Sequence, residues 1–262
     1  MRTPIIEVRD LKAGYGETAI LEGISFDIHP GEILVVVGGS GCGKSTLLRH
    51  LVGLQPPISG TISYWGKDIT KMEEDELGRL LRRVGLSFQG GALFNSMTVG
   101  ENVSLPLEEY GIGDPAQRRT LARMKLSLVG LGDQVRRYPE ELSGGMKKRV
   151  GFARAIAADP EVVFFDEPSA GLDPIIGAGL DRVILELRRL MDLTMVVVTH
   201  ELYSIRTVAD RVLMLDGGRI VFIGTLGEAE TSDHPRVRQF FLRRPDQGIG
   251  DRAPKSASGT SG

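Results

Sequence analysis

The segment from residue 32 to residue 54, EILVVVGGSGCGKSTLLRHLVGL, constrains the fold of this chain most strongly. An apolar run comes first, a glycine-rich loop follows, and a stretch with helical character comes directly after it. Within the loop, Gly38, Gly43, Lys44 and Ser45 have the spacing of a phosphate-binding loop, G-x-x-x-x-G-K-[ST]. A strand, a tight loop and a helix in this order predict an α/β sheet that holds an anion at one edge.

The loop can bind phosphate through its backbone. Glycines let successive N–H groups turn inward around phosphate oxygens, and the helix presents its positive N-terminal end to the same charge. We expect Lys44 to reach the β- and γ-phosphates of a nucleotide and Ser45 to ligate magnesium. The alternative is a glycine-rich turn without a ligand, and the flanking strand and helix argue against it. The expected nucleotide contacts are Gly38, Gly39, Ser40, Gly41, Cys42, Gly43, Lys44, Ser45 and Thr46.

Composition narrows the functional classes. The 262 residues carry 32 basic and 34 acidic side chains, so no overall field attracts nucleic acid, and we expect no nucleic-acid partner. No window approaches the about 20 apolar residues that span a bilayer, so the chain is expected to be neither exported nor membrane-spanning. The single cysteine, Cys42, favours a reducing compartment. Its place beside a helix N-terminus predicts a lowered pKa for its thiol, although it also fits a spacer role.

Apolar, β-branched runs recur along the chain and predict strands. Several are apolar at every position, as in strands covered on both faces, so the sheet is expected to be parallel at its centre. After Phe88 the strand-like runs give way to helical patterns, with N-caps predicted at Asp114 and at Thr98, three residues before Glu101. We therefore expect a helical subdomain inserted at about residues 90–157.

The C-terminal part contains two further elements. The segment LMLDGGRIVFIG predicts a hairpin that turns at Gly217-Gly218, and HPRVRQFFLRR predicts one short amphipathic helix. Residues 246–262 are polar and rich in Gly, Ser and Pro, so a disordered tail is expected there. Residues 1–245 are then the expected nucleotide-binding domain.

A second predicted site lies in residues 161–168, EVVFFDEP, where an apolar strand ends in two carboxylates. Ligands of an open α/β sheet gather at the carboxyl ends of its strands, so Asp166 and Glu167 are expected near the phosphates. Neighbouring side chains on an extended chain point different ways, so one carboxylate can hold magnesium while the other faces an attacking water. A surface loop or a helix cap is the alternative for such a pair.

The third motif, LSGGMKKRVGFARAIAADP, occupies residues 142–160. Ser143 is a good N-cap, the two glycines after it leave backbone N–H groups exposed, and the helix is expected to run to Asp159-Pro160. This pattern predicts a second helix N-terminus that could bind an anion. An ordinary capped helix is the alternative.

The segments GGSGCGKS, LSGGM, VVFFDEP, SAGLD and VVVTH, in this order, resemble the nucleotide-binding subunit of ABC transporters over about residues 5–245. The resemblance implies ATP and Mg²⁺ as cofactors. It also implies a P-loop NTPase core in the α/β class, with an antiparallel β subdomain and an inserted helical signature subdomain.

Matched position by position, the resemblance assigns roles around the nucleotide. It implies that Tyr15 stacks on adenine and that Gln89 touches magnesium and the attacking water. It further implies that Asp166 directs magnesium, that Glu167 is the general base and that His200 contacts the γ-phosphate. Alternatives remain for three of them: a loop aromatic packed on the core for Tyr15, a strand end for Gln89 and a helix cap for His200.

The resemblance also implies a second copy of the chain. Ser143, Gly144 and Gly145 match the signature that holds the γ-phosphate of the opposite subunit, and Asp173 matches the inter-subunit loop. Met146 stands where this family usually has glutamine, and it cannot donate the amide's hydrogen bonds. Two chains paired head to tail would then form two composite sites.

LSGGM with basic residues after it, and the C-terminal HPRVRQFF, are similar to the ATPase of Mla- or Mce-type lipid transport systems. This similarity implies phospholipid transport through a polytopic permease, with an MCE-type lipid-binding partner and a small regulatory subunit that RVRQFFLRR would contact. A solvated basic helix is the alternative for that segment. The implied location is the cytoplasmic face of the inner membrane. Another ABC importer or exporter, or a soluble ABC-type ATPase that acts on nucleic acid or ribosomes, is the alternative function.

Overall fold

The computed structural model describes residues 3–243, and a six-stranded sheet forms its centre. Every neighbouring pair in this sheet is parallel except the pair at one edge formed by its two C-terminal strands, which is an antiparallel hairpin. In spatial order the strands are β10 (Arg219–Thr225), β9 (Arg211–Asp216), β3 (Ile33–Gly38), β8 (Thr194–Val198), β7 (Val162–Asp166) and β6 (Val84–Ser87).

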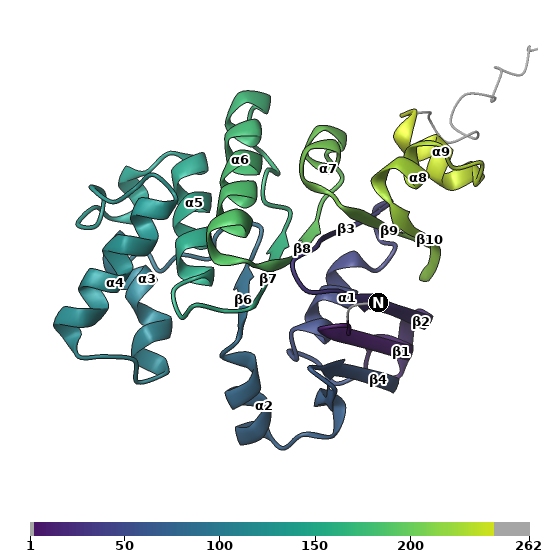
Figure 1. Ribbon diagram of the computed structural model, residues 1–262, viewed down its shortest axis with the longest axis horizontal. Coiled ribbons are helices and arrows are strands. Elements are labelled where there is room, and N and C mark those ends of the chain that lie inside the picture. The colour runs from purple at the N-terminus through teal and green to yellow at the C-terminus, as the bar shows by residue number, and fades with distance from the viewer. Residues whose placement is uncertain (1–2, 244–262) are drawn as a thin grey trace, which may run out of the picture.

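A second, wholly antiparallel sheet lies beside the first, on the right of Figure 1. In spatial order its strands are β2 (Thr18–Ile28), β1 (Ile6–Tyr15), β4 (Ser59–Tyr64) and β5 (Lys67–Asp68). A mainly parallel sheet with an antiparallel β sheet beside it confirms the predicted α/β fold class.

Helices cover the larger sheet and fill the connections. The α-helices are α1 (Lys44–Leu51), α2 (Glu74–Leu81), α3 (Val99–Glu109), α4 (Pro115–Leu128), α5 (Gly144–Ala155), α6 (Pro174–Met191), α7 (Leu202–Val208), α8 (Leu226–Glu230) and α9 (Pro235–Phe241). Two short 3₁₀ turns occupy Ile69–Lys71 and Pro139–Glu141. Within residues 3–243, no helix has the length and apolar character needed to cross a bilayer.

The side chains of β3 alternate between two hydrophobic cores. Ile33, Val35 and Val37 pack with the core that the helices cover, whereas Leu34 and Val36 pack with α1 and the antiparallel sheet. This alternation explains why β3 is apolar at every position, since neither of its faces meets water.

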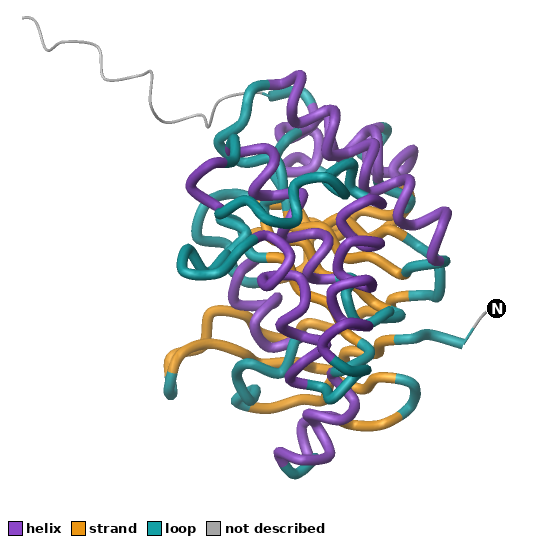
Figure 2. Tube along the Cα trace, turned by 90° about the vertical axis from the view of Figure 1, so that its left-hand side faces the viewer, coloured by secondary structure: helices purple, strands orange, loops and turns teal. Residues whose placement is uncertain are grey.

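Helices α3, α4 and α5 form one group at the side of the molecule away from the antiparallel sheet (Figure 1), and Figure 2 shows them in front of the strands. Residues 88–161, which are all described, contain no strand. The predicted caps are present: Thr98 and Glu101 form a capping box, and Asp114 caps α4 with proline at its first position. Gln117 completes a second capping box with Asp114.

The predicted end of α5 was wrong, because the helix ends at Ala155 and not at Asp159-Pro160. The backbone N–H of Ala157 donates to the Arg154 carbonyl three residues back, so the last turn tightens. Asp159 then has a φ of 52°, which a helix does not allow. The turn that follows Ala155 lets the chain reverse direction and enter β7, which pairs with β6.

The C-terminal elements agree with the sequence prediction. The β9–β10 hairpin turns at Gly217 and Gly218, both of which have positive φ. The predicted short helix is α9, which buries Val237 and Phe241. The predicted disordered tail, residues 246–262, lies outside the described residues.

Candidate functional site

The carboxyl ends of four parallel strands meet at one edge of the larger sheet. Strand register aligns them, since Val198 pairs with both Val36 and Asp166, and Ser87 pairs with Phe165. The loops that follow these strands carry the predicted phosphate loop, Gln89, the two carboxylates and His200. The fold thus brings together motifs that are up to about 160 residues apart in the sequence.

The phosphate loop has a conformation that requires glycine. Gly38 and Gly43 have φ of 147° and 105°. A Cβ atom would lie 2.3 Å from the Leu215 carbonyl oxygen at Gly38 and 2.5 Å from Leu21 Cδ2 at Gly43. Bulkier residues would therefore displace the loop from its strand.

The donors at this loop fit a phosphate group. Lys44 Nζ donates to the carbonyl oxygens of Gly38 and Gly39, each at 2.9 Å, so the ammonium is held across the loop. Helix α1 begins at Lys44, and no side chain caps its first backbone N–H groups. Uncapped N–H groups and a fixed cation beside them are the donors that the phosphates of ATP need. Ser45 and Thr46 follow in the first turn of this helix.

The expected low pKa of Cys42 was wrong. The residue is 7% exposed and packs into the core with Leu47 and the antiparallel sheet. Burial raises the pKa of the thiol, and the Lys44 ammonium, 4.0 Å from Sγ, opposes this to a smaller extent. Burial dominates because a thiolate loses its hydration there. The side chain of Cys42 therefore fills space beneath the loop, and only its backbone is available to a ligand.

The two predicted carboxylates lie at the end of β7. Asp166 is its last residue, and burial raises the pKa of this carboxyl, with the charge of Glu167 acting in the same direction. The positive charges of Arg49 and Lys44 act against this rise. Asp166 is thus half-buried beside the phosphate loop, where a cation would favour its ionised form.

Glu167 adopts an unusual backbone conformation. Its φ is 48°, and its N–H donates to the Val198 carbonyl at 2.8 Å. His200 Nδ1 lies 2.9 Å from Glu167 Oε1, with the Nδ1–H tautomer donating to the carboxylate. The other oxygen, Oε2, is buried and accepts no hydrogen bond among the described residues. A carboxylate with an oxygen that accepts no hydrogen bond retains the lone pairs that a general base needs.

Gln89 and Tyr15 lie at the surface of the site. Gln89 occupies the exposed turn after β6, which the Gly91 N–H closes onto the Phe88 carbonyl. Tyr15 is 43% exposed, so it is not packed into the core. Arg49 Nη1 donates to Tyr15 Oη at 2.9 Å and thereby ties the ring to α1.

The predicted signature residues lie on a different part of the chain. Ser143 caps α5 by accepting the Met146 N–H at 3.3 Å, and Met146 packs partly against the helix-covered core. A Cβ atom at Gly145 would lie 2.5 Å from Ile176 Cγ2, so the start of α5 touches the segment after Asp173. Asp173 itself caps α6 through the N–H groups of Ile175 and Ile176. Within residues 3–243, no hydrogen bond or ion pair joins the signature residues Ser143, Gly144 and Gly145 to Lys44, Ser45 or Asp166.

Sequence reasoning missed Lys148. This residue is 8% exposed, and its ammonium donates to the Glu167 carbonyl at 3.1 Å. The pattern of basic residues after LSGGM was visible in the sequence, but nothing in it indicated which of them faces inward. Arg49 was also missed, because nothing in the sequence indicated that its side chain contacts Tyr15.

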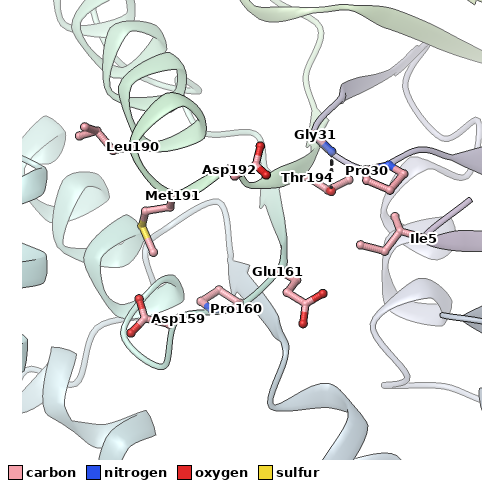
Figure 3. Close-up of a pocket in the computed structure, with 10 residues that line it drawn as sticks. All are labelled: Ile5, Pro30, Gly31, Asp159, Pro160, Glu161, Leu190, Met191, Asp192 and Thr194. Carbon is pink, nitrogen blue, oxygen red and sulfur yellow. Dashed lines mark hydrogen bonds between the residues drawn. The ribbon is translucent and has the colours of Figure 1, made fainter. Parts of the chain in front are cut away.

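A cavity of about 540 Å³ lies at the amino ends of β7 and β8, opposite the predicted site. Figure 3 shows its lining, in which the Gly31 N–H donates to Thr194 Oγ1 at 3.0 Å. Two of its three acidic residues have partners elsewhere, since Asp159 pairs with Lys125 and Glu161 pairs with Arg83. The phosphate loop, the two carboxylates and the histidine lie together at the opposite edge of the sheet, away from this cavity.

Comparisons with known proteins agree with this geometry. Residues 21–170 match the family described as ABC transporter. The chain is 39% identical over 240 residues to the methionine import ATP-binding protein MetN of Brucella abortus. The matched region covers 92% of this chain and 65% of that protein. It is 40% identical over 253 residues to the probable ribonucleotide transport ATP-binding protein mkl of Mycobacterium leprae, with 97% of this chain and 73% of that protein covered. The chain thus spans less than two thirds of the MetN length.

Solved structures of ATP-binding cassettes are also similar to this chain. One is a dimeric ATP-binding cassette in a post-hydrolysis state bound to ADP and Pi, with a TM-score of 0.77, 30% identity, and coverage of 84% of this chain and 98% of that one. Another is cbiO1 from Clostridium perfringens, part of the ABC transporter complex cbiONQ, with a TM-score of 0.79, 28% identity, and coverage of 92% and 96%. With the phosphate loop, the paired carboxylates and the histidine at one sheet edge, these matches show that the chain belongs to the ABC transporter family and is an ATPase cassette of that family.

Proposed function

We propose that this chain hydrolyses ATP to drive a membrane transporter and that it works as a pair with a second copy of itself. One observation carries the proposal: the phosphate loop, Asp166, Glu167 and His200 meet at the carboxyl edge of one sheet. In this proposal residues 1–245 form the nucleotide-binding domain, and about residues 90–157 form its helical signature subdomain.

Each side chain at the edge then has a distinct task. Lys44 neutralises phosphate charge, Tyr15 stacks on adenine, and the Glu167 carboxylate accepts a proton from the attacking water. His200 pairs with Oε1 of Glu167 and so fixes the orientation of the carboxylate. Ser45, Gln89 and Asp166 would hold magnesium, whose charge stabilises the phosphate oxygens when it is bound.

The second copy supplies what a single chain lacks. Ser143 caps α5 and Gly144 and Gly145 begin it, with Ser143 and Gly144 exposed, but none of the three makes a hydrogen bond to the phosphate loop of its own chain. A head-to-tail pair would place them against the partner's γ-phosphate, with Asp173 at the junction and the partly buried Met146 beside them. The dimeric cassette among the similar structures supports this arrangement.

The proposed cargo is phospholipid, moved through a polytopic permease with an MCE-type lipid-binding partner and a small regulatory subunit. The LSGGM signature with Lys147 and Lys148 after it, and the basic helix α9, support this choice. The two named relatives are described for methionine and for ribonucleotides, and they are almost equally identical to this chain. Similarity of the cassette therefore does not select the cargo, which other subunits contact. The cassette would lie on the cytoplasmic face of the inner membrane, held there by the permease.

Purification of the full chain from detergent-solubilised membranes tests the proposal. A polytopic permease as companion, with phospholipid identified in the complex by mass spectrometry, is the expected result. Methionine or ribonucleotide in place of lipid would refute the proposed cargo and leave the transport role intact. Ribosomal or DNA-repair proteins as the companions would refute the transport role itself.

A further inference from the structure

Lys148 is a buried lysine whose only hydrogen-bond acceptor among the described residues is a backbone carbonyl at the site. It lies on the second turn of α5, is 8% exposed, and donates from Nζ to the Glu167 carbonyl at 3.1 Å. Burial lowers the pKa of Lys148, and the negative charge of Glu167 raises it. A buried ammonium is costly to desolvate, so its position here calls for a physical reason.

The peptide that Lys148 contacts belongs to a residue in a disfavoured conformation. Glu167 has a φ of 48°, which a residue with a Cβ atom adopts only when its surroundings hold it there. Three hydrogen bonds hold it: its N–H donates to the Val198 carbonyl at 2.8 Å, and its carbonyl accepts from the Ala170 N–H at 3.2 Å and from Lys148 at 3.1 Å. The first fixes the peptide before the residue to β8, the second closes a local turn, and the third fixes the peptide after the residue to α5.

Helix α5 is itself fixed against the catalytic edge. Arg154 donates to the carbonyl oxygens of Gly91 and Ala92 at 2.7 and 2.8 Å, in the loop that follows Gln89. One turn earlier, a Cβ atom at Gly151 would lie 3.2 Å from the Gly91 Cα, so the helix and this loop are in close contact. The ammonium of Lys148 is therefore presented to Glu167 from a rigid support.

We propose that Lys148 is a positioning residue, which holds the Glu167 peptide so that the carboxylate pairs with His200 and stays in place to act as the base. The inference rests on the proposed role of Glu167 as the base. Because the signature residues begin the same helix, Lys148 also joins the part of the chain that meets the partner's nucleotide to the base of its own site.

Three variants of the full chain test this role. Lys148→Met keeps the length and apolar stem but removes the donor, and Lys148→Arg keeps a charged donor. Lys125→Met is the matched control, since Lys125 is 7% exposed on α4 and its ammonium pairs with Asp159 at the opposite edge of the sheet. The measurements are kcat and KM for MgATP by phosphate release, with the melting temperature of each variant.

We expect Lys148→Met to lower kcat about tenfold or more with KM for ATP changed less than about twofold, because Lys148 affects the base and not nucleotide binding. Lys148→Arg should recover most of kcat, and Lys125→Met should lower the melting temperature while leaving kcat unchanged. An unchanged kcat in Lys148→Met, an equal loss in Lys125→Met, or no recovery in Lys148→Arg would each overturn the inference. Absence of ATP hydrolysis by the wild-type chain would instead refute the proposed function.

Discussion

Replacing Glu167 with glutamine isolates the chemical role of the carboxylate from its shape. The amide has nearly the same size, so contacts with β8 and the backbone at a φ of 48° are retained. What is lost is the charge 2.9 Å from His200 Nδ1 and the basicity of the free Oε2. A positioned general base contributes about 10²–10⁴ in rate, so kcat should fall by that factor, or about 2.7–5.4 kcal/mol in activation free energy.

The stability of this variant should change little by comparison. An amide group left without a partner in the half-buried site costs about 1 kcal/mol, which lowers the melting temperature by about 2–4 °C for a domain of this size. Nucleotide binding should persist, so MgATP is expected to convert the variant to a stable dimer in size-exclusion chromatography. The matched control is Glu161→Gln, one residue before β7, where the carboxylate pairs with Arg83 at 2.7 Å on the far edge. Hydrolysis by Glu167→Gln at the rate of the control would refute the assignment of the base.

Three further perturbations have defined outcomes. Lys44→Ala should abolish ATP turnover, because the ammonium held across the phosphate loop is lost; phosphate release at the wild-type rate would contradict the loop's role. Maleimide should label Cys42 slowly and equally with and without MgATP, because its thiol is buried and its pKa is raised; fast labelling of the folded chain, followed by mass spectrometry, would contradict the structure. Truncation after His234 removes the buried Val237 and Phe241, each worth about 1.5–3 kcal/mol, so the melting temperature should fall by several degrees; an unchanged value would show that α9 does not stabilise the domain.

The motifs that the sequence revealed are local ones. The phosphate loop, the capping box of Thr98 and Glu101, and the hairpin at Gly217-Gly218 all follow from residues within about seven positions of one another. Such patterns predict the local backbone geometry, because glycine conformation and cap hydrogen bonds depend on neighbouring residues in the sequence. The fold class followed because fully apolar strands alternate with helices.

The features that the sequence did not reveal depend on packing between distant segments. Lys148 and Glu167 are 19 residues apart, and their contact exists only because α5 lies against the end of β7. The pKa of Cys42 could not be predicted from its place beside a helix, because the direction of the shift is set by the core that encloses the thiol. The early end of α5 likewise follows from how the chain must turn to enter β7.

The alternation of side chains along the central strands has a consequence for unfolding. Neighbouring residues of β7 and β8, such as Phe164 and Phe165, belong to different cores, as do those of β3. Because the same strands contribute side chains to both cores, exposing one core to water would also disrupt the strand pairing on which the other core depends. The antiparallel sheet and the helix-covered face should therefore melt in one cooperative transition, and the phosphate loop, which continues β3, should lose its shape at that same temperature.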